Sequence, residues 1–375
     1  MASSPKIAII SDWITHKGGS ERVILSLLSA FPEADLFTSV YEPDALLAKD
    51  FAHVNVHTTW LQKLPRPIRK LHKFFPMLRV KAFRSLDLSA YDVILSSTSA
   101  EAKQVRKTRP DQVHICYCYT PIRYYWSHYD EYLKNPGFGK LNPLVRLAMR
   151  IMVPSLRKAD YSAAQEVDSF VAISEAIQKR IEKYYGRDSS VIHPPVDIER
   201  FFPSAKRVNE RSGYVSLGRQ VPYKRHDLAI AACTKLNLPL TVIGSGSEHE
   251  YLKSIAGPSV EFVTNATDEA VAAYLGSAKG FIFPAEEDFG IVQVEALAAG
   301  TPVIAYAAGG SRDIIHDSEG GVTFEAQTTE DLADALQRFE SMTFQPAKLQ
   351  RVAKRFHGNL FATKIRKVVA DTTRQ

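Results

Sequence analysis

The chain has 375 residues, which is too long for one compact core and typical of two α/β domains. Hydrophobic residues make up 45% of it and charged residues 23%, as in an ordinary soluble globular protein, and three cysteines are too few for a secreted disulfide framework. No apolar run has the length of a signal peptide or of a membrane-spanning helix. We therefore expect a protein of the reducing cytoplasm.

The net charge of +6 is concentrated in the first half, since residues 1–200 carry +7 and residues 201–375 carry −1. Residues 51–86 and 132–159 contain no acidic residue, and their cations are interleaved with apolar residues. A solvated basic face is the usual explanation of a charge run. The interleaving favours a surface that contacts an anionic membrane. No recognised nucleic-acid-binding motif accompanies the charge, so nucleic acid is the weaker alternative.

Within residues 51–86, we expect Phe74, Phe75 and Leu78 to enter the membrane interface while the cations contact headgroups. The competing explanation is that these apolar residues pack inside the first domain. The cations of this segment are Lys63, Arg66, Arg69, Lys70, Lys73, Arg79, Lys81 and Arg84.

Short β-rich runs alternate with stretches of helical period, a pattern that predicts βαβ units around a parallel sheet. The strands predicted in the first half are residues 7–11, 36–40, 93–97, 113–118 and 170–173. Helices are predicted at residues 21–31 and 174–185, the second with Ser174 as its N-cap. We place the interdomain crossing at residues 193–197, because their paired prolines stop helix and strand alike.

The second half repeats the alternation and ends in a basic stretch of helical period, residues 346–374. The strands predicted there are residues 214–217, 240–243, 260–262, 280–283 and 302–305. Ligands of doubly wound sheets bind at the carboxyl ends of the strands, so a cleft between the two domains is the default site.

Four segments lie where a predicted strand ends and a helix begins. The first, His16-Lys17-Gly18-Gly19-Ser20-Glu21-Arg22, has two glycines that would let the backbone approach a phosphate at a helix N-terminus. A plain tight turn explains that segment as well. The second, Gly218-Arg219-Gln220-Val221-Pro222-Tyr223-Lys224-Arg225, carries an arginine and a lysine that can clamp a diphosphate. Two solvated cations are the alternative there.

The third segment places Glu286, Glu287 and Asp288 after the strand at residues 280–283. Three adjacent acids repel one another unless cationic or polyhydroxyl partners are present, and carboxylates accept paired sugar hydroxyls well. Glu295 follows Glu287 by about two helical turns, so we expect both on one wall of the site. Acids that decorate a helix N-terminus are the ordinary alternative.

The fourth segment, Tyr306-Ala307-Ala308-Gly309-Gly310-Ser311, is another glycine turn before a helix. A further turn, Gly244-Ser245-Gly246-Ser247-Glu248, lacks the third glycine of a dinucleotide fingerprint, so it does not indicate NAD.

The order of these four segments resembles the family-4 retaining glycosyltransferases of the GT-B fold. The resemblance covers nearly the whole chain and is closest in residues 215–232 and 281–296, and residues 191–197 are similar to the family's interdomain segment. Residues 91–94 and 116–124 are similar to the branch that builds O-antigen and exopolysaccharide chains, often from GDP-mannose.

This resemblance implies two Rossmann-like domains that face each other across a central cleft. Residues 1–195 would form the acceptor-side domain and residues 196–350 the donor-nucleotide domain. Residues 351–375 would form a C-terminal helix that packs back on the first domain.

The resemblance also implies roles for single residues. Arg219 and Lys224 match the pair that binds the donor diphosphate, Glu287 the glutamate near the transferred sugar, and Glu295 the glutamate that accepts from ribose hydroxyls. The other donor-binding residues implied are Gly18, Gly19, Gly218, Phe289, Gly290, Ile291 and Val292. The expected acceptor-side residues are Ser20, Arg22 and Arg123.

Tyr119 departs from the family pattern, in which histidine usually follows the second cysteine and contacts the donor sugar. A tyrosine keeps a hydroxyl for hydrogen bonding but cannot be a cation near neutral pH. We expect either a changed donor-sugar preference or a positional role, with packing at the sheet edge as the plainer alternative. Tyr119, Glu287, Arg219 and Lys224 form the predicted catalytic set.

The activity implied is transfer of a sugar, best matched by mannose from GDP-mannose, to a lipid-linked or saccharide acceptor with retention of configuration. No metal and no cofactor are expected, because the family needs none and no metal-ligand spacing occurs. The protein would work in the cytoplasm, peripherally on the inner face of the cytoplasmic membrane. The alternatives are a UDP-sugar-dependent transferase, a nucleotide-sugar epimerase of the same fold, and a non-catalytic sugar-nucleotide-binding protein.

Overall fold

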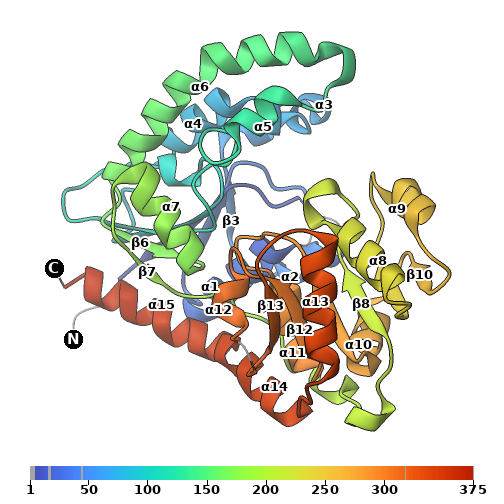
Figure 1. The fold of residues 1–375 in the computed structure, drawn as a ribbon. Coiled ribbons are helices and arrows are strands. Elements are labelled where there is room, and N and C mark those ends of the chain that lie inside the picture. The colour runs from blue at the N-terminus through green and yellow to red at the C-terminus, as the bar shows by residue number, and fades with distance from the viewer. Residues whose placement is uncertain (1–4, 16–17, 44, 317, 375) are drawn as a thin grey trace. The chain divides into compact units, whose positions relative to one another are not determined.

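The computed structural model describes residues 5–15, 18–43, 45–316 and 318–374, which fold as two units (Figure 1). One unit holds the residues up to His193 together with those from Phe361 onward, and the other holds Pro194–Leu360. Each unit is built on its own parallel β-sheet. The change of unit falls within the proline-containing segment in which the sequence places the interdomain crossing.

Seven parallel strands form the sheet of the first unit, in the order β3-β2-β1-β4-β5-β6-β7. They are β1 Ile7–Ser11, β2 Asp35–Thr38, β3 Val56–Thr58, β4 Val93–Thr98, β5 Val113–Cys118, β6 Ser169–Ala172 and β7 Ser189–Val191. The sequence predicts five of them, and β1 and β5 have the predicted bounds. It misses β3 and β7, because these are three-residue edge strands with partly exposed side chains and carry no buried apolar run.

Helices lie in the connections between these strands. They are α1 Gly19–Ala30, α2 Ala45–Asp50, α3 Arg66–Arg69, α4 Pro76–Arg84, α5 Tyr129–Lys134, α6 Asn142–Gln165 and α7 Glu175–Tyr185. The predicted N-cap of α7 is confirmed, since the Ser174 hydroxyl accepts a hydrogen bond from the Ile177 amide. Gly186, in the left-handed conformation, ends this helix.

Six parallel strands form the sheet of the second unit, in the order β10-β9-β8-β11-β12-β13. They are β8 Tyr214–Leu217, β9 Leu240–Ile243, β10 Val260–Val263, β11 Gly280–Phe283, β12 Val303–Tyr306 and β13 Gly321–Phe324. Its helices are α8 His226–Lys235, α9 His249–Ile255, α10 Asp268–Ser277, α11 Ile291–Ala298, α12 Ser311–Ile314, α13 Thr329–Glu340 and α14 Pro346–Ala353. The sequence predicts every strand of this sheet except β13.

The basic tail is two helices rather than one. After α14, a 3-10 turn and the extended residue His357 precede α15, Gly358–Thr372. The part of α15 from Phe361 belongs to the first unit, where the Phe361 and Tyr117 rings lie 5.5 Å apart and Arg366 Nε donates to the Ala30 carbonyl at 2.9 Å. Among the described residues, no helix is both long and apolar enough to cross a bilayer.

Two of the residues predicted to face a membrane instead pack against the rest of the first unit, Arg79 as a buried and Leu78 as a half-buried side chain. Arg79 is 1% exposed, and its guanidinium donates to the Glu101 carboxylate at 2.6 and 2.9 Å. Leu78 packs against the cluster that contains the buried Leu61. The prediction is therefore wrong for these two residues, because a charge run records composition and not which cation has a buried partner.

Candidate functional site

In the second unit, the segments that follow β8 and β11 meet at one edge of the sheet. These strands are parallel neighbours, so their carboxyl ends lie side by side. Lys224, in the 3-10 turn Pro222–Lys224 after β8, forms an ion pair with Glu287, in the loop after β11. The two side chains are 12% and 21% exposed. The structure therefore joins the residues predicted for the diphosphate and for the transferred sugar.

Arg219 lies on the loop between β8 and Lys224 and is exposed, with one guanidinium nitrogen 3.2 Å from the Tyr223 hydroxyl. The Tyr223 ring also lies 5.8 Å from Lys224 Nζ, so this aromatic residue contacts both predicted diphosphate ligands. The sequence analysis gives Tyr223 no role. Its place between an arginine and a lysine is the signal that could have identified it.

Gly218 brings the backbone close to the Lys224 side chain. Its φ of +150° favours glycine, and a Cβ there would stand 3.6 Å from Lys224 Nζ and 3.8 Å from His226 Nε2. His226 is buried, its Nδ1 lies 2.8 Å from the Ser216 hydroxyl, and burial lowers its pKa to about 4. A neutral imidazole therefore backs the predicted diphosphate loop, and no local pattern in the sequence marks it.

The turn Gly244-Ser245-Gly246 serves to pack the β8 loop. The buried Gln220 donates from Nε2 to the Gly244 carbonyl at 2.8 Å and from its backbone N–H to the Ser245 carbonyl at 2.9 Å. A side chain at Gly244 would collide with the Gly218 carbonyl, and one at Gly246 with the Gln220 carbonyl. These glycines allow two loops to touch, which agrees with the sequence argument against a dinucleotide fingerprint.

The glycine pair Gly309-Gly310 holds the acidic loop in place. The Gly310 N–H donates to the Glu287 carbonyl at 2.9 Å, and a side chain at Gly309 would collide with the same carbonyl. Gln327 Nε2 donates to the Pro284 carbonyl at 2.7 Å at the start of the loop. The fourth predicted segment thus fixes the backbone that carries Glu287.

Glu295 lies on a different element from Glu287. Helix α11 begins at Ile291, after Gly290 with φ of +87°, so Glu287 belongs to the preceding loop. The prediction that Glu287 and Glu295 are separated by two turns of one helix is therefore wrong. Glu295 is 7% exposed on the second turn, and a side chain at Gly290 would collide with Gln293 Nε2.

Phe289, the remaining predicted donor-site residue of this loop, is a packing residue as far as its side chain is concerned. It is 3% exposed, and its ring lies 5.6 Å from that of Phe356. A role in ligand binding is left to its backbone, as the resemblance implies.

In the first unit, Tyr119 lies beside the start of α1. Its hydroxyl is 2.8 Å from the Ser97 hydroxyl and donates to the Ser20 carbonyl at 3.2 Å. Burial raises the pKa of Tyr119, so the phenol stays protonated at neutral pH. Gly18 is the N-cap of α1 and carries no side-chain cap. The structure therefore brings Tyr119 to the first predicted glycine turn, whose residues 16 and 17 lie outside the described ranges.

The predicted acceptor-side residues occupy two places in this unit. Ser20 is exposed in the first turn of α1, where its hydroxyl donates to the Glu21 carboxylate at 2.8 Å, and Arg22 is half-buried on the same helix. Arg123 is half-buried in the segment after β5, and its carbonyl accepts from the His128 amide at 2.9 Å.

Tyr119→His provides a test of the departure from the family pattern. We expect a changed rate or a changed preference among donor sugars, because imidazole replaces a neutral phenol that bonds to the backbone of α1. Initial rates with a set of nucleotide sugars would measure it. Tyr119→Phe is the control, since it removes only the hydroxyl. An unchanged profile for both variants would leave packing as the role of Tyr119.

Asp12 and the segment after β4 form a buried polar network that the sequence analysis misses. The Asp12 carboxylate accepts from the Thr98 hydroxyl and from the amides of Ser99, Ala100 and Ala102, at 2.8 to 3.0 Å. Burial, with the nearby Glu101 charge as a second cause, raises the pKa of Asp12. An acid directly after the first strand was the available signal.

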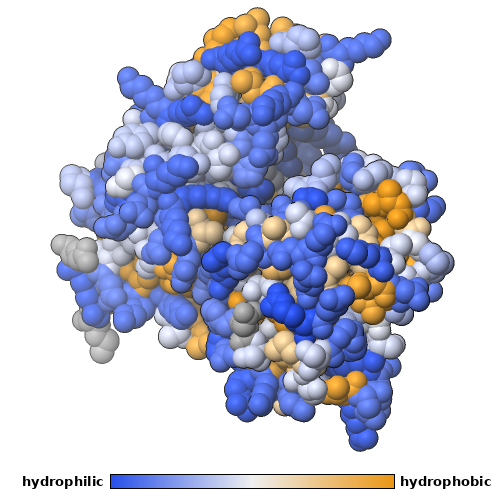
Figure 2. All heavy atoms as spheres, in the orientation of Figure 1, coloured by the Kyte–Doolittle hydropathy of each residue, from blue (hydrophilic) through white to orange (hydrophobic). Residues whose placement is uncertain are grey.

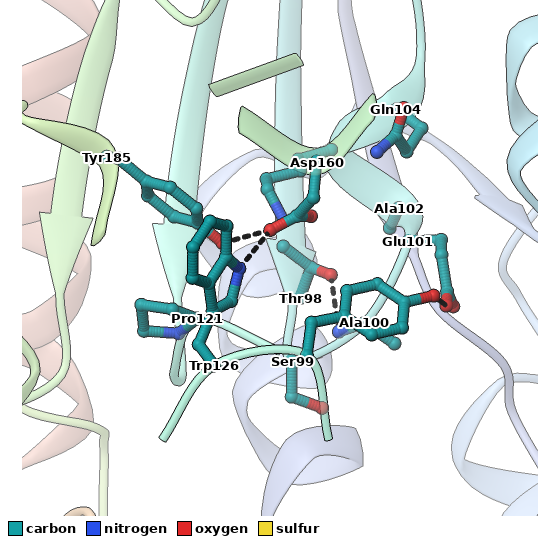
Figure 3. A network of polar contacts seen from close by, with 12 residues as sticks. Thr98, Ser99, Ala100, Glu101, Ala102, Gln104, Pro121, Trp126, Asp160 and Tyr185 are labelled. Carbon is teal, nitrogen blue, oxygen red and sulfur yellow. Dashed lines mark hydrogen bonds and ion pairs between the residues drawn. The ribbon is translucent and has the colours of Figure 1, made fainter. Parts of the chain in front are cut away.

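A second buried network lies next to it (Figure 3). Asp160 accepts from Trp126 Nε1 and from the Tyr185 hydroxyl, each at 2.8 Å, and forms a buried ion pair with Lys103. These contacts tie α6 and α7 to the segment after β4. The network holds the segment that follows β4 in place, and the side chains of Lys103, Asp160 and Tyr185 are buried.

Within the described ranges, no group of three or more His, Cys, Asp or Glu side chains could hold a metal ion. Metal independence stays a prediction.

Two family models match the chain, one for each unit. "Glycosyltransferase Family 4" matches residues 17–200, and "Glycosyl transferases group 1" matches residues 197–356. Among curated relatives, the D-inositol 3-phosphate glycosyltransferase of a Nocardioides species is 29% identical over 211 residues, 46% of each chain. The GDP-mannose-dependent alpha-(1-6)-phosphatidylinositol monomannoside mannosyltransferase of Mycolicibacterium smegmatis is 27% identical over 214 residues, 49% of this chain and 56% of that one. The chain thus spans about half the length of these relatives.

Solved structures share the fold over the whole length. HepE of Anabaena, in complex with UDP and glucose, has a TM-score of 0.65 at 16% identity and covers 98% of this chain and 100% of its own. The lipopolysaccharide outer core galactosyltransferase WaaB has a TM-score of 0.70 at 17% identity, over 98% of this chain and 99% of its own. With two parallel sheets and both family models in place, the chain belongs to the family-4 glycosyltransferases and has the GT-B fold.

Proposed function

We propose that this chain is a retaining hexosyltransferase that moves mannose from GDP-mannose to a lipid-linked or saccharide acceptor in the assembly of a cell-surface polysaccharide. The observation that carries the proposal is the ion pair between Lys224 and Glu287, which lie beyond the carboxyl ends of β8 and β11. Arg219 lies on the same loop as Lys224. Cations next to a carboxylate suit a ligand whose diphosphate adjoins a sugar. The mycolicibacterial relative, whose name states a GDP-mannose donor, supports the choice of donor.

In this reaction an acceptor hydroxyl attacks the anomeric carbon on the face from which the diphosphate departs. The bond from the anomeric carbon to the diphosphate oxygen breaks as the new glycosidic bond forms, and the leaving diphosphate takes the acceptor proton. Negative charge grows on the diphosphate, where Arg219, Lys224 and the N-terminal amides of α11 would stabilise it. Glu287 would bind hydroxyls of the transferred sugar, and Glu295 those of the ribose. No metal is required, because the two cations supply the positive charge.

A UDP-sugar donor is the second candidate. It is supported by HepE, whose structure contains UDP and glucose and whose fold covers nearly all of this chain. The residues proposed for the diphosphate serve either nucleotide, so the choice depends on contacts to the base and the sugar.

A lipid-linked acceptor would bring the enzyme to the inner face of the cytoplasmic membrane. The exposed cations in the two acid-free segments support attachment to anionic lipid.

A panel of nucleotides tests the donor assignment. We expect GDP and GDP-mannose to raise the melting temperature more than UDP, ADP or their sugars, because a ligand that binds only the folded protein stabilises it by about 2.7 kcal/mol at 100 times its Kd. Product analysis by mass spectrometry and NMR should then show mannosyl transfer with retained anomeric configuration, and the same rate with EDTA. Release of free sugar without an acceptor would instead indicate an epimerase, and a preference for UDP would reject the GDP assignment.

A further inference from the structure

Helix α6 presents apolar side chains to solvent along one face. Leu144, Leu147 and Ile151, spaced by three and four residues, are 65%, 53% and 68% exposed. The other face of the helix packs on the first unit through the buried Val153 and Leu156. Three large aliphatic residues in a row on a solvent face are unfavourable in water and indicate that something covers them.

A second segment extends this surface. Residues 66–77 carry five exposed apolar side chains, and among them Phe74 contacts Phe138, from the segment before α6, with ring centroids 5.4 Å apart. That contact joins the two acid-free segments of the sequence into one surface. This apolar face comprises Ile68, Leu71, Phe74, Phe75, Met77, Phe138, Leu141, Leu144, Leu147 and Ile151. Figure 2 shows apolar residues gathered where Figure 1 places the first part of α6.

Within the two acid-free segments that form the apolar face, every charge is positive. Arg66, Lys70, Lys140 and Arg150 are exposed there, and neither acid-free segment supplies a carboxylate to neutralise them. The neighbouring Arg69 is already paired within the unit, since its guanidinium donates to the Glu42 carboxylate and to the Gln62 carbonyl. Aliphatic residues in the centre with cations beside them are complementary to a bilayer that carries anionic headgroups, and a protein partner would have to be both apolar and acidic.

We propose that the apolar face inserts into the interface of an anionic membrane, with α6 in the plane of the bilayer and Leu144, Leu147 and Ile151 among the acyl chains. Arg66, Lys70, Lys140 and Arg150 contact the lipid phosphates. This inference rests on the proposed function only in that a lipid-linked acceptor gives the enzyme a reason to be at the membrane. It leaves out the half-buried Leu78 and the buried Arg79 and adds exposed residues of α6.

Vesicle sedimentation of the full chain tests the proposal. We expect the wild type to pellet with phosphatidylglycerol-containing vesicles at low salt, to be released at high salt, and to ignore phosphatidylcholine vesicles. The triple variant Leu144→Ser, Leu147→Ser, Ile151→Ser should bind at least about tenfold more weakly. A matched control, Tyr251→Ser with Ile255→Ser, alters exposed apolar residues of α9 and should bind as the wild type does.

Insertion is separated from purely electrostatic attachment by a label on α6. The three native cysteines are buried, so Leu147→Cys can be labelled selectively with a polarity-sensitive fluorophore. Its emission should shift to the blue on anionic vesicles. Unchanged emission, or a serine variant that pellets like the wild type, would contradict insertion. Wild type that ignores the vesicles and sediments as a dimer, which the serine variant lacks, would assign the face to a second copy.

The same proteins separate this inference from the proposed function. The serine variant should keep wild-type donor binding and wild-type transfer to a water-soluble acceptor, and lose transfer only to an acceptor embedded in vesicles. Membrane binding without transfer to any acceptor would reject the function and leave the membrane surface intact. Transfer without membrane binding would reject the membrane surface and leave the proposed function intact.

Discussion

Replacing Arg79 by methionine is expected to destabilise the first unit by about 3–5 kcal/mol, because it leaves the buried Glu101 carboxylate without its cation. The guanidinium also donates to the His72 carbonyl at 2.5 Å and to the Tyr124 hydroxyl at 3.0 Å, so four polar contacts are lost. The uncompensated Glu101 charge would also act on Asp12, whose pKa the nearby Glu101 carboxylate already helps to raise.

Urea unfolding followed by tryptophan fluorescence measures this effect. Trp13, Trp60 and Trp126 are the three tryptophans of the chain and all belong to the first unit, so their signal reports that unit. Lys81→Met is the matched control, since Lys81 is exposed on the same helix α4 and should change stability little.

A double variant distinguishes loss of the ion pair from loss of packing. Arg79→Met combined with Glu101→Leu removes both charges and should recover part of the stability, because the stranded carboxylate is gone. Equal stability of Arg79→Met and the wild type would show that the pair contributes nothing. A double variant that is less stable by the sum of both single effects would assign the cost to packing.

Arg79 also illustrates what the sequence could not predict. Its partner Glu101 is 22 residues away and follows a different strand, so no local pattern marks one cation of a basic run as buried. The exposure of the leucines of α6 was equally unpredictable. Helical period predicts an apolar face but does not show whether a neighbouring element covers that face.

The strand-end position of the segments proposed to bind the donor was predictable, because glycine and charge at a strand end leave a local signal. The bounds of β8 and β11 follow from buried apolar runs, and Gly218 and Lys224 lie in the loop and turn that come after β8. That Lys224 meets Glu287, 63 residues later, depends on the order of the strands in the sheet. His226 could not be found, because a buried neutral imidazole carries no pattern of its own.

Lys224→Ala is expected to weaken binding of the nucleotide diphosphate by about 1.5–3 kcal/mol, roughly 10- to 150-fold, while the fold is kept. The side chain is only 12% exposed, but it stands in the turn after β8 and outside the hydrophobic core cluster of the second unit, so little core is lost with it. Arg219→Ala should act in the same direction. Full activity of either variant at limiting donor would exclude the diphosphate clamp.

Glu287→Gln separates the two halves of the same ion pair. In the free protein the Glu287 carboxylate forms an ion pair with Lys224, so an incoming diphosphate competes with Glu287 for that cation. Replacing the carboxylate by an amide removes the competitor, and affinity for free nucleotide diphosphate is expected to stay equal or rise. Turnover should nevertheless fall roughly 100-fold, because a contact to the reacting sugar is lost.

Isothermal titration with nucleotide diphosphate, combined with kcat and KM for the sugar donor, measures both effects in one set of proteins. Glu295→Ala should show the opposite pattern to Glu287→Gln, with nucleotide affinity lost first, because its proposed partner is the ribose. Lys235→Ala is the control for a lost cation, since Lys235 is exposed at the far end of α8. If Glu287→Gln and Glu295→Ala lose nucleotide affinity equally, Glu287 acts on the nucleotide and its assignment to the transferred sugar is wrong.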